Sequence, residues 1–345
     1  MNPRAVAFLH DLMQQALAKL QAVDHACADG VFDDFSKVYL ADSTGFGLPE
    51  SLHHLFPGSG GSASVAGAKI QLVWEYTQSL FAHFALTPLT LPDQKYVDQV
   101  IALAQRGCLF IFDLGYFKIS AFDLISQAGA YFLSRLNHQT NLYEGETSGL
   151  SPLDLVEFLK ETPFDVIEKA IFIGEKERVS SRLIAVRLPD EIVNECRRVA
   201  RQKAKKKGYT PTESHLFLLS RNLFITNVPS DIWTPETVIK SYPIRWQIEL
   251  IFKSWKSHCH LAVINAKKKE TVLCYLYGRM LLVLLTYALY PQIRSALWMK
   301  KHRELSLLKF VSHFQALADS WMKMIFKSEL TRRRFLQEAC DDAAR

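Results

Sequence analysis

The stretch Cys108–Asp113, with the sequence CLFIFD, is the strongest indication of how this chain folds. Its apolar residues follow one another without alternating polar ones, which is typical of a β-strand buried on both faces. A second β-type run, SKVYLA, ends at Asp42, residues 68–91 suit the two strands of a hairpin, and residues 130–134 form a further strand. Helical segments separate the later runs. This order predicts an α/β fold, a mixed sheet flanked by helices.

The chain has 345 residues, enough for a core domain with a large insertion. Apolar residues near the N-terminus recur at three- and four-residue steps, which indicates a helix. A later region holds several β-type runs, of which His215–Leu219 is one, and we expect it to be an inserted subdomain. The expected divisions are a short helical segment at 1–30, the first part of the core at 31–139, a β-rich insertion at 140–232, a core helix at 233–265 and a helical C-terminal region at 266–345.

Composition limits the classes of protein that this chain can be. Hydrophobic residues make up 49% of it, so it can bury a sizeable core and is not globally disordered. The 41 Lys+Arg against 35 Asp+Glu give a net charge of +6, which favours a polyanionic partner. None of the 6 cysteines forms a C-x-x-C pair, and the N-terminus lacks the pattern of a signal peptide. We therefore expect reduced thiols in a cytoplasmic protein. The tripeptide His258–His260 is a weak zinc motif.

The segment Val272–Tyr290 is nearly apolar enough to span a membrane. It carries Arg279 near its middle, together with Gly278, Thr286 and tyrosines. A single span after so many polar segments would be unusual. We therefore expect a buried core helix here and no membrane partner.

Three acidic residues are the candidate catalytic groups. Asp42 and Asp113 come at the ends of apolar strands, and Glu249 lies on a late helix. Carboxylate oxygens suit Mg²⁺ or Mn²⁺, and two such ions about 4 Å apart can promote cleavage of a phosphodiester. Carboxylates from neighbouring strand ends and from a helix packed on the sheet can converge. Taken alone, an aspartate after a strand is also a common turn residue or helix cap, so that alternative stays open.

The late helix, SYPIRWQIELIFKSWK at residues 241–256, has more than one charged group on a single face. Intervals of three, four and seven residues place Tyr242, Arg245, Glu249 and Lys256 on that face. Arginine and lysine can hold phosphate oxygens while the carboxylate takes a metal. The alternative is a solvated helix in which Arg245 and Glu249 form an i,i+4 ion pair.

The spacing Tyr-x2-Arg-x3-Glu-x6-Lys resembles the signature of the insertion-sequence-four family of DDE transposases, which includes the transposases of the Tn-five and Tn-ten elements. Two further segments resemble that family in the same order. They are LADSTGFGLPESL around Asp42 and LFIFDLGYFKISAFDLISQAGAYFLSRLN around Asp113. The resemblance covers residues 31–290.

This resemblance implies an RNase H-like core in which Asp42, Asp113 and Glu249 are catalytic and hold two Mg²⁺ (or Mn²⁺) ions. It also implies DNA-binding roles for five residues: Tyr242, Arg245, Lys256, Arg135 and Trp233. Trp233 would stack on a flipped base, although core packing or a role at the entry to the late helix explains a tryptophan there at least as well. The 136 residues from Asp113 to Glu249 (249 − 113) agree with the β-rich insertion of this family.

The expected function is cut-and-paste transposition, meaning cleavage of transposon ends and strand transfer into target DNA. Double-stranded DNA would be the partner, and the C-terminal helices from Val272 onward could pair two copies on two ends. The basic run Arg197–Lys207 could contact the DNA backbone or be a solvated helix face. Only 41 residues precede Asp42, which leaves open a shortened, non-catalytic DNA-binding copy that inhibits full-length transposase. An RNase H-like nuclease is the other alternative.

Overall fold

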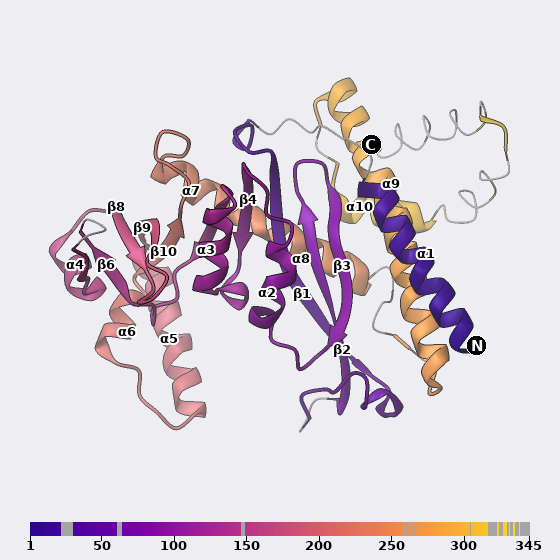
Figure 1. The fold of residues 1–345 in the computed structure, drawn as a ribbon, viewed down its shortest axis with the longest axis horizontal. Helices are drawn as coiled ribbons and strands as arrows, with labels where there is room; N and C mark the ends of the chain where they lie inside the picture. The colour runs from indigo at the N-terminus through magenta and orange to yellow at the C-terminus, as the bar shows by residue number, and fades with distance from the viewer. Residues whose placement is uncertain are drawn as a thin grey trace. The chain divides into compact units, whose positions relative to one another are not determined.

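The chain forms two compact units, and Figure 1 labels their helices and strands. Unit 1 comprises Met1–Gly30, Tyr39–Pro92 and Trp246–Arg345, and unit 2 comprises Val31–Val38 and Asp93–Arg245. The computed structural model describes residues 1–21, 30–60, 64–145, 149–257, 260, 263–264, 266–303 and 305–316, with single residues and one short stretch beyond.

The sheet of unit 1 consists of β1 (Lys37–Leu48), β2 (Ala66–Glu75) and β3 (Leu80–Pro88), which pair in antiparallel order. The hairpin from β2 to β3 is tight because the buried Glu75 carboxylate accepts hydrogen bonds from the backbone of Thr77 and Gln78. β1 continues through Gly45 and Gly47 because β2 pairs with it there. A larger residue at Gly45 would force the end of the Leu89 side chain to move. The predicted hairpin at residues 68–91 is confirmed.

In the described part of unit 1, the helices that accompany this sheet are α1 (Pro3–Gln21), α8 (Trp246–Ser257), α9 (Lys269–Lys301) and α10 (Leu307–Ala316). A short 3-10 turn, η1 (Glu50–Leu52), follows β1. α8 packs against β3 through Trp255, whose ring meets those of Phe81 and Phe84. α9 is tied to α8 by a buried 2.8 Å hydrogen bond between the hydroxyls of Ser254 and Tyr287. α9 also contacts the sheet directly, because the ring of Tyr287 meets those of Phe81 and Trp74.

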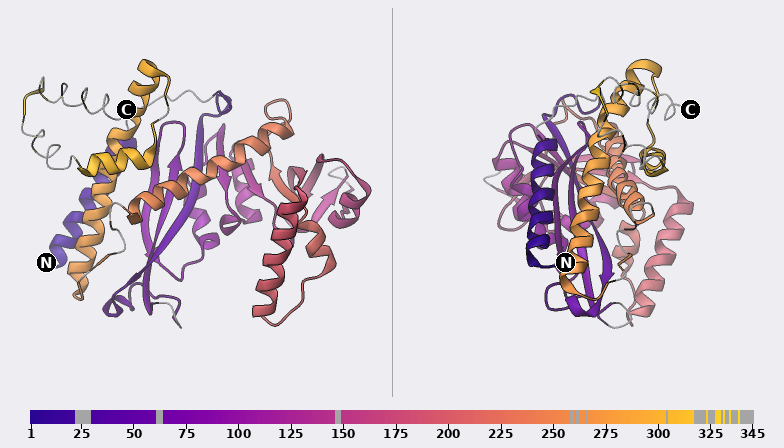
Figure 2. Two further views of the ribbon diagram at one scale, coloured as in Figure 1. Left: turned by 180° about the vertical axis from the view of Figure 1, so that it is seen from behind. Right: turned by 90° about the vertical axis from the view of Figure 1, so that its right-hand side faces the viewer.

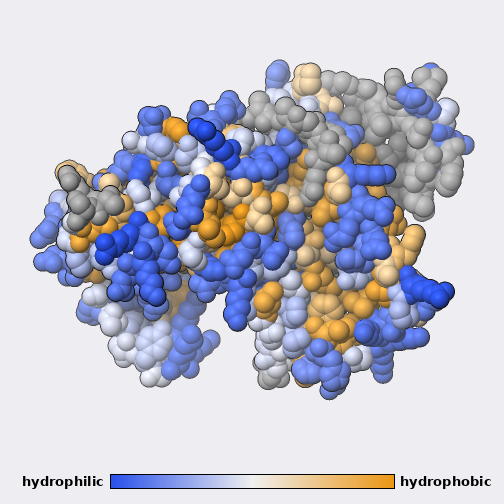
Figure 3. All heavy atoms as spheres, viewed as in Figure 1, coloured by the Kyte–Doolittle hydropathy of each residue, from blue (hydrophilic) through white to orange (hydrophobic). Residues whose placement is uncertain are grey.

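α9 runs beside α1 (Figure 2). By length and composition its segment Lys269–Met299 could cross a membrane, but a core helix of a soluble protein meets the same criterion. Half of its most apolar stretch is buried inside the protein, so the prediction of a buried core helix stays a prediction. The neighbouring α1 exposes Phe8 and Leu12, and hydrophobic side chains are visible among hydrophilic ones in that part of the molecule (Figure 3).

The sheet of unit 2 has the strand order β4-β5-β10-β9-β8-β6-β7. Its strands are β4 (Cys108–Phe112), β5 (Tyr131–Arg135), β6 (Leu142–Glu144), β7 (Ser151–Pro152), β8 (Val166–Ile173), β9 (Val179–Arg187) and β10 (Arg221–Thr226). β4 and β5 are parallel and the other pairs are antiparallel. Every residue of β4 is buried, as its unbroken apolar sequence predicts.

The helices of unit 2 lie between these strands in the sequence. They are α2 (Asp93–Ile101), η2 (Leu114–Tyr116), α3 (Ile119–Gln127), α4 (Leu155–Glu161), α5 (Asp190–Lys206), α6 (Glu213–Leu218), α7 (Pro235–Ser241) and η3 (Tyr242–Arg245). α3 connects the parallel strands β4 and β5, as a parallel pair requires a crossover. Side chains of Asp154, Thr212 and Thr234 cap the N-termini of α4, α6 and α7.

The predicted α/β class, a mixed sheet flanked by helices with a helical C-terminal region, is confirmed. One predicted strand is wrong. His215–Leu219 lies in and just after α6, because Thr212 caps a helix there and the strand of this region, β10, begins only at Arg221. The described cysteines Cys108, Cys196 and Cys274 are free thiols, and Cys27, Cys259 and Cys340 lie outside the described residues. So does most of the weak zinc motif His258–His260.

Candidate active site

Asp113 follows the buried strand β4 in unit 2. Its backbone is extended, with φ −82° and ψ 165°, and its side chain is half-buried. It occupies the N-cap position of η2, but its carboxylate makes no capping hydrogen bond to that turn. The common structural role of a strand-end aspartate is therefore not the role of Asp113.

Two more of the predicted residues lie on the same edge of unit 2 as Asp113. The phenol of Tyr242 donates a hydrogen bond to the carbonyl oxygen of Phe112 at 3.4 Å, which holds Tyr242 at the end of β4. Burial raises the pKa of Tyr242 to about 12; the Asp113 charge adds to this rise, while Arg245 and Arg135 oppose it. The phenol is therefore neutral at physiological pH and can donate a hydrogen bond.

Arg135 reaches this edge through the strand register. β4 and β5 run parallel with Phe112 opposite Ser134, so the next residues, Asp113 and Arg135, both follow the paired segment at its carboxyl end. Sites in α/β sheets commonly form at that end of parallel strands. A 2.8 Å hydrogen bond from the Arg135 guanidinium to the side-chain oxygen of Asn222 on β10 orients it. Sequence analysis missed Asn222, because only the pairing of β10 with β5 brings it to Arg135.

Asp42 lies in unit 1, and its place in the strand differs from the prediction. The sequence predicts that the strand ends at Asp42, but β1 extends to Leu48 and pairs Asp42 with Leu72 of β2. The antiparallel partner β2 holds the residues after Asp42 in the strand. The Asp42 side chain is half-buried and accepts a 2.7 Å hydrogen bond from the backbone N–H of Ser43.

The predicted continuous helix over residues 241–256 is also wrong. The chain forms α7, then the 3-10 turn η3, then α8, because Pro243 has no N–H to donate to an α-helical hydrogen bond. Tyr242 and Arg245 are buried in η3, in unit 2. Glu249 is half-buried in the first turn of α8, where the helix dipole favours a negative charge, and Lys256 is exposed in its last turn, both in unit 1.

Trp233 is a core residue of unit 2. Its indole is 1% exposed, packs edge-on against Phe32 and Phe35, and donates a 3.1 Å hydrogen bond to the carbonyl oxygen of Val31. These contacts support the packing alternative for this tryptophan rather than stacking on a flipped base.

The candidate residues are thus distributed over both units. In unit 2, Asp113, Arg135 and Arg245 each interact electrostatically with Tyr242, while Asp42, Glu249 and Lys256 belong to unit 1. Among the described residues, no three histidine, cysteine, aspartate or glutamate side chains are grouped as ligands of one metal ion. The three carboxylates nevertheless provide the hard oxygen donors that Mg²⁺ or Mn²⁺ prefers.

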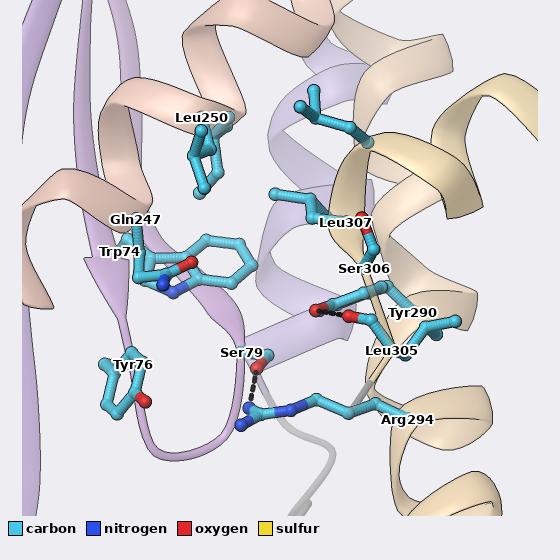
Figure 4. A pocket seen from close by; sticks show the side chains of 12 residues that line it. Trp74, Tyr76, Ser79, Gln247, Leu250, Tyr290, Arg294, Leu305, Ser306 and Leu307 are labelled. Atoms are coloured by element: carbon cyan, nitrogen blue, oxygen red, sulfur yellow. Dashed lines mark hydrogen bonds between the residues drawn. The ribbon is translucent and has the colours of Figure 1, made fainter. Parts of the chain in front are cut away.

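A separate cavity of about 390 Å³ lies in unit 1 (Figure 4). Trp74, Gln247 and Leu250 face it from the sheet and from α8. Arg294 of α9 closes one side with a 3.0 Å hydrogen bond to the hydroxyl of Ser79. Glu249 does not line this cavity, so the cavity is not part of the candidate active site.

Comparison with known families assigns the chain to a class. Residues 33–285 match the family model described as transposase DDE domain, a span that includes all the candidate residues above. The chain belongs to this family. It is a DNA transposase, an enzyme that binds DNA and depends on divalent metal ions.

Among its relatives are transposases of insertion sequences. The chain is 30% identical over 330 residues to the transposase of IS231F from Bacillus thuringiensis subsp. israelensis, covering 91% of this chain and 69% of that protein. It is 30% identical over 328 residues to the transposase of IS1151 from Clostridium perfringens, covering 90% and 69%. The predicted resemblance to insertion-sequence transposases is confirmed; kinship with the Tn-five and Tn-ten elements stays a prediction.

A solved structure of the piggyBac transposase, in a synaptic complex with hairpin DNA, aligns with 90% of this chain and 58% of that chain. The TM-score is 0.44 and the sequence identity 11%.

Proposed function

We propose that this transposase cleaves DNA at transposon ends and joins them to target DNA, using Asp42, Asp113 and Glu249 as ligands of two Mg²⁺ or Mn²⁺ ions. The observation that carries the proposal is the group around Asp113. Its carboxylate follows a buried strand and does not cap the next turn, and Asp113, Arg245 and Arg135 all interact electrostatically with the same neutral phenol, that of Tyr242. A carboxylate can bind Mg²⁺ or Mn²⁺, and arginines can hold phosphate oxygens.

Each of the remaining groups has a role that its chemistry supports. Arg245 and Arg135 can hold non-bridging phosphate oxygens, Arg245 through a bidentate fork. Lys256, exposed on the last turn of α8, adds a point charge to the DNA backbone. Tyr242 can donate a hydrogen bond to a phosphate oxygen once DNA displaces its weak contact with Phe112. Bound ions would activate a water and stabilise the leaving oxygen.

In the proposed reaction, a water oxygen forms a bond to phosphorus as the bond from phosphorus to the 3′-oxygen breaks. The freed 3′-hydroxyl then attacks a phosphodiester of target DNA in the same way, with one bond formed and one broken. No covalent bond to the protein is needed. The comparisons do not favour the alternatives of a non-catalytic copy or a nuclease that does not transpose.

We further propose that two copies act together, because two ends must be held in one complex. α9 supports this proposal, since it exposes Tyr275, Leu282 and Leu285, which lie seven and three residues apart along the helix. Sedimentation of the protein with end DNA should give the mass of a dimer. A monomer at all protein concentrations would reject the pairing.

The direct test is cleavage of DNA that carries the ends of the matching element, with and without Mg²⁺. Glu249→Gln should lower the cleavage rate about 10³-fold or more, because loss of a metal ligand removes several kcal/mol of transition-state stabilisation. Glu213→Gln, an exposed glutamate on α6, is the matched control and should cleave like the parent protein. Equal cleavage by both variants would reject the assignment of Glu249.

A further inference from the structure

The C-terminal end of α5 in unit 2 carries a cluster of exposed positive charges. Arg201, Lys203, Lys205, Lys206 and Lys207 are all exposed, and no ion pair joins them to the described part of the chain. The acidic residues of α5 lie near its start, where Glu195 pairs with Arg198.

Helix stability does not explain this cluster. Positive charge near a helix C-terminus is favourable, but Arg201 with Lys205 and Lys203 with Lys207 are like-charged pairs four residues apart. Such pairs destabilise a helix. A polyanion bound along this surface would relieve the repulsion.

The end of the helix forms a shallow hollow on one side of this cluster. Gly208, with φ +75°, ends α5 in a Schellman motif in which the N–H of Tyr209 bonds the carbonyl oxygen of Ala204 at 3.1 Å. The chain then turns back toward α6, as Figure 2 shows. The hollow has a volume of about 470 Å³ and is lined by Arg201, Lys205, Gly208, Tyr209, Thr210 and Pro211.

The lining residues match the chemistry of a phosphate group. Arg201 provides a planar fork of donors and Lys205 a point charge, 40° apart around the helix by its period of about 3.6 residues. Tyr209, which is 57% exposed, and Thr210 add hydroxyl donors. Lys203 and Lys206 point about 100° to 160° away from this pair and belong to other sides of the helix.

We propose that this hollow, which we call the α5 hollow, binds a backbone phosphate of duplex DNA away from the bonds that react. The inference rests on the proposed function for the identity of the polyanion. The contact involves no base edge, so it strengthens binding without selecting sequence.

The test measures the affinity of the full chain for a 40-bp duplex of arbitrary sequence between 50 and 200 mM salt. For Arg201→Gln/Lys205→Gln, the slope of log affinity against log salt should fall by about 0.9, because one phosphate contact is lost. At 100 mM salt the affinity should fall on the order of tenfold or more.

The matched control, Lys203→Gln/Lys206→Gln, removes the same charge from the same helix and should keep most of the parent slope. An unchanged slope in the α5 hollow variant, or equal losses in both variants, would overturn the proposal. Tighter binding of an RNA duplex of equal length would overturn the assignment to DNA. The charge-preserving variant Arg201→Lys/Lys205→Arg should retain the parent slope, and circular dichroism verifies that every variant folds.

Glu249→Gln separates this proposal from the proposed function. It should abolish cleavage while keeping the salt slope, whereas the α5 hollow variant should cleave at the parent rate when protein saturates the DNA. If the parent protein fails to cleave, the proposed function fails. The salt slopes of Arg201→Gln/Lys205→Gln and Lys203→Gln/Lys206→Gln still test whether the α5 hollow binds a phosphate.

Discussion

Asp113 and Asp42 each follow an apolar β-type run, yet the fold gives them different surroundings. Asp113 comes after the last residue of a fully buried parallel strand and is coupled to Tyr242, whose sequence position is remote. Asp42 lies inside the 12-residue antiparallel strand β1, and its carboxylate bonds its own neighbour Ser43. The same local pattern therefore produces one carboxylate surrounded by distant residues and one held by its own strand.

The largest expected effect comes from removing either charge. If both aspartates hold metal ions, Asp113→Asn and Asp42→Asn should each lower the rate of end cleavage by about 10³- to 10⁴-fold, since each loses a ligand. Single-turnover cleavage assays measure this, with Asp231→Asn, an exposed turn residue of unit 2, as control. A parent-like cleavage rate for Asp42→Asn would show that Asp42 has only a structural role in β1.

A second test concerns Trp233, which is buried in the core of unit 2. Trp233→Ala should lower the free energy of unfolding by about 3–5 kcal/mol, because it empties a filled core site. Trp246→Ala should change it little, since Trp246 is 60% exposed. Urea denaturation compares the two. If Trp233→Ala left stability unchanged and reduced cleavage instead, the packing role of this tryptophan would be wrong.

The phenol beside Asp113 gives a smaller, pH-dependent effect. The pKa of Tyr242 is about 12 in the fold, against about 10 unfolded. The unfolded chain thus loses this proton first as pH rises, and stability that is fully present below pH 10 declines between about pH 10 and 12.

The loss of this contribution should lower the free energy of unfolding by about 1 kcal/mol between pH 9 and 11. Unfolding experiments at both pH values should therefore show a smaller decline for Tyr242→Phe than for the parent protein. Tyr209→Phe, at an exposed position, serves as the control. Equal declines in the parent protein and Tyr242→Phe would show that Tyr242 is not held as the structure indicates.

The smallest effect should come from Asn222, which orients Arg135 across the sheet. Asn222→Ala should weaken binding of end DNA by about 1 kcal/mol, or roughly fivefold, because Arg135 keeps its charge and loses only one hydrogen bond. Arg135→Ala should weaken binding more. Asn194→Ala, an exposed asparagine on α5, is the control. Fluorescence anisotropy can resolve these differences, and equal affinities for all four proteins would remove Arg135 from the DNA-binding surface.

Several elements could be predicted because their signals are local. The buried strand β4 follows from five apolar residues in sequence, and the hairpin of β2 and β3 from its two β-type runs. Other predictions failed where a neighbour or a single residue decided the outcome. β1 continues past Asp42 because β2 pairs with it, and the helix after Pro235 breaks because of Pro243. Asn222 could not be found, because its partner lies 87 residues earlier.

By itself, the sequence determined the α/β class, the order of its acidic segments and the relation to insertion-sequence transposases, since periodicity and motif spacing are properties of neighbouring residues. Only the tertiary structure decided that Asp113, Arg245 and Arg135 all interact with Tyr242, and that Trp233 is buried. The physical reason is that burial and electrostatic coupling depend on distances in space, and strands paired across a sheet bring together side chains that the sequence keeps far apart.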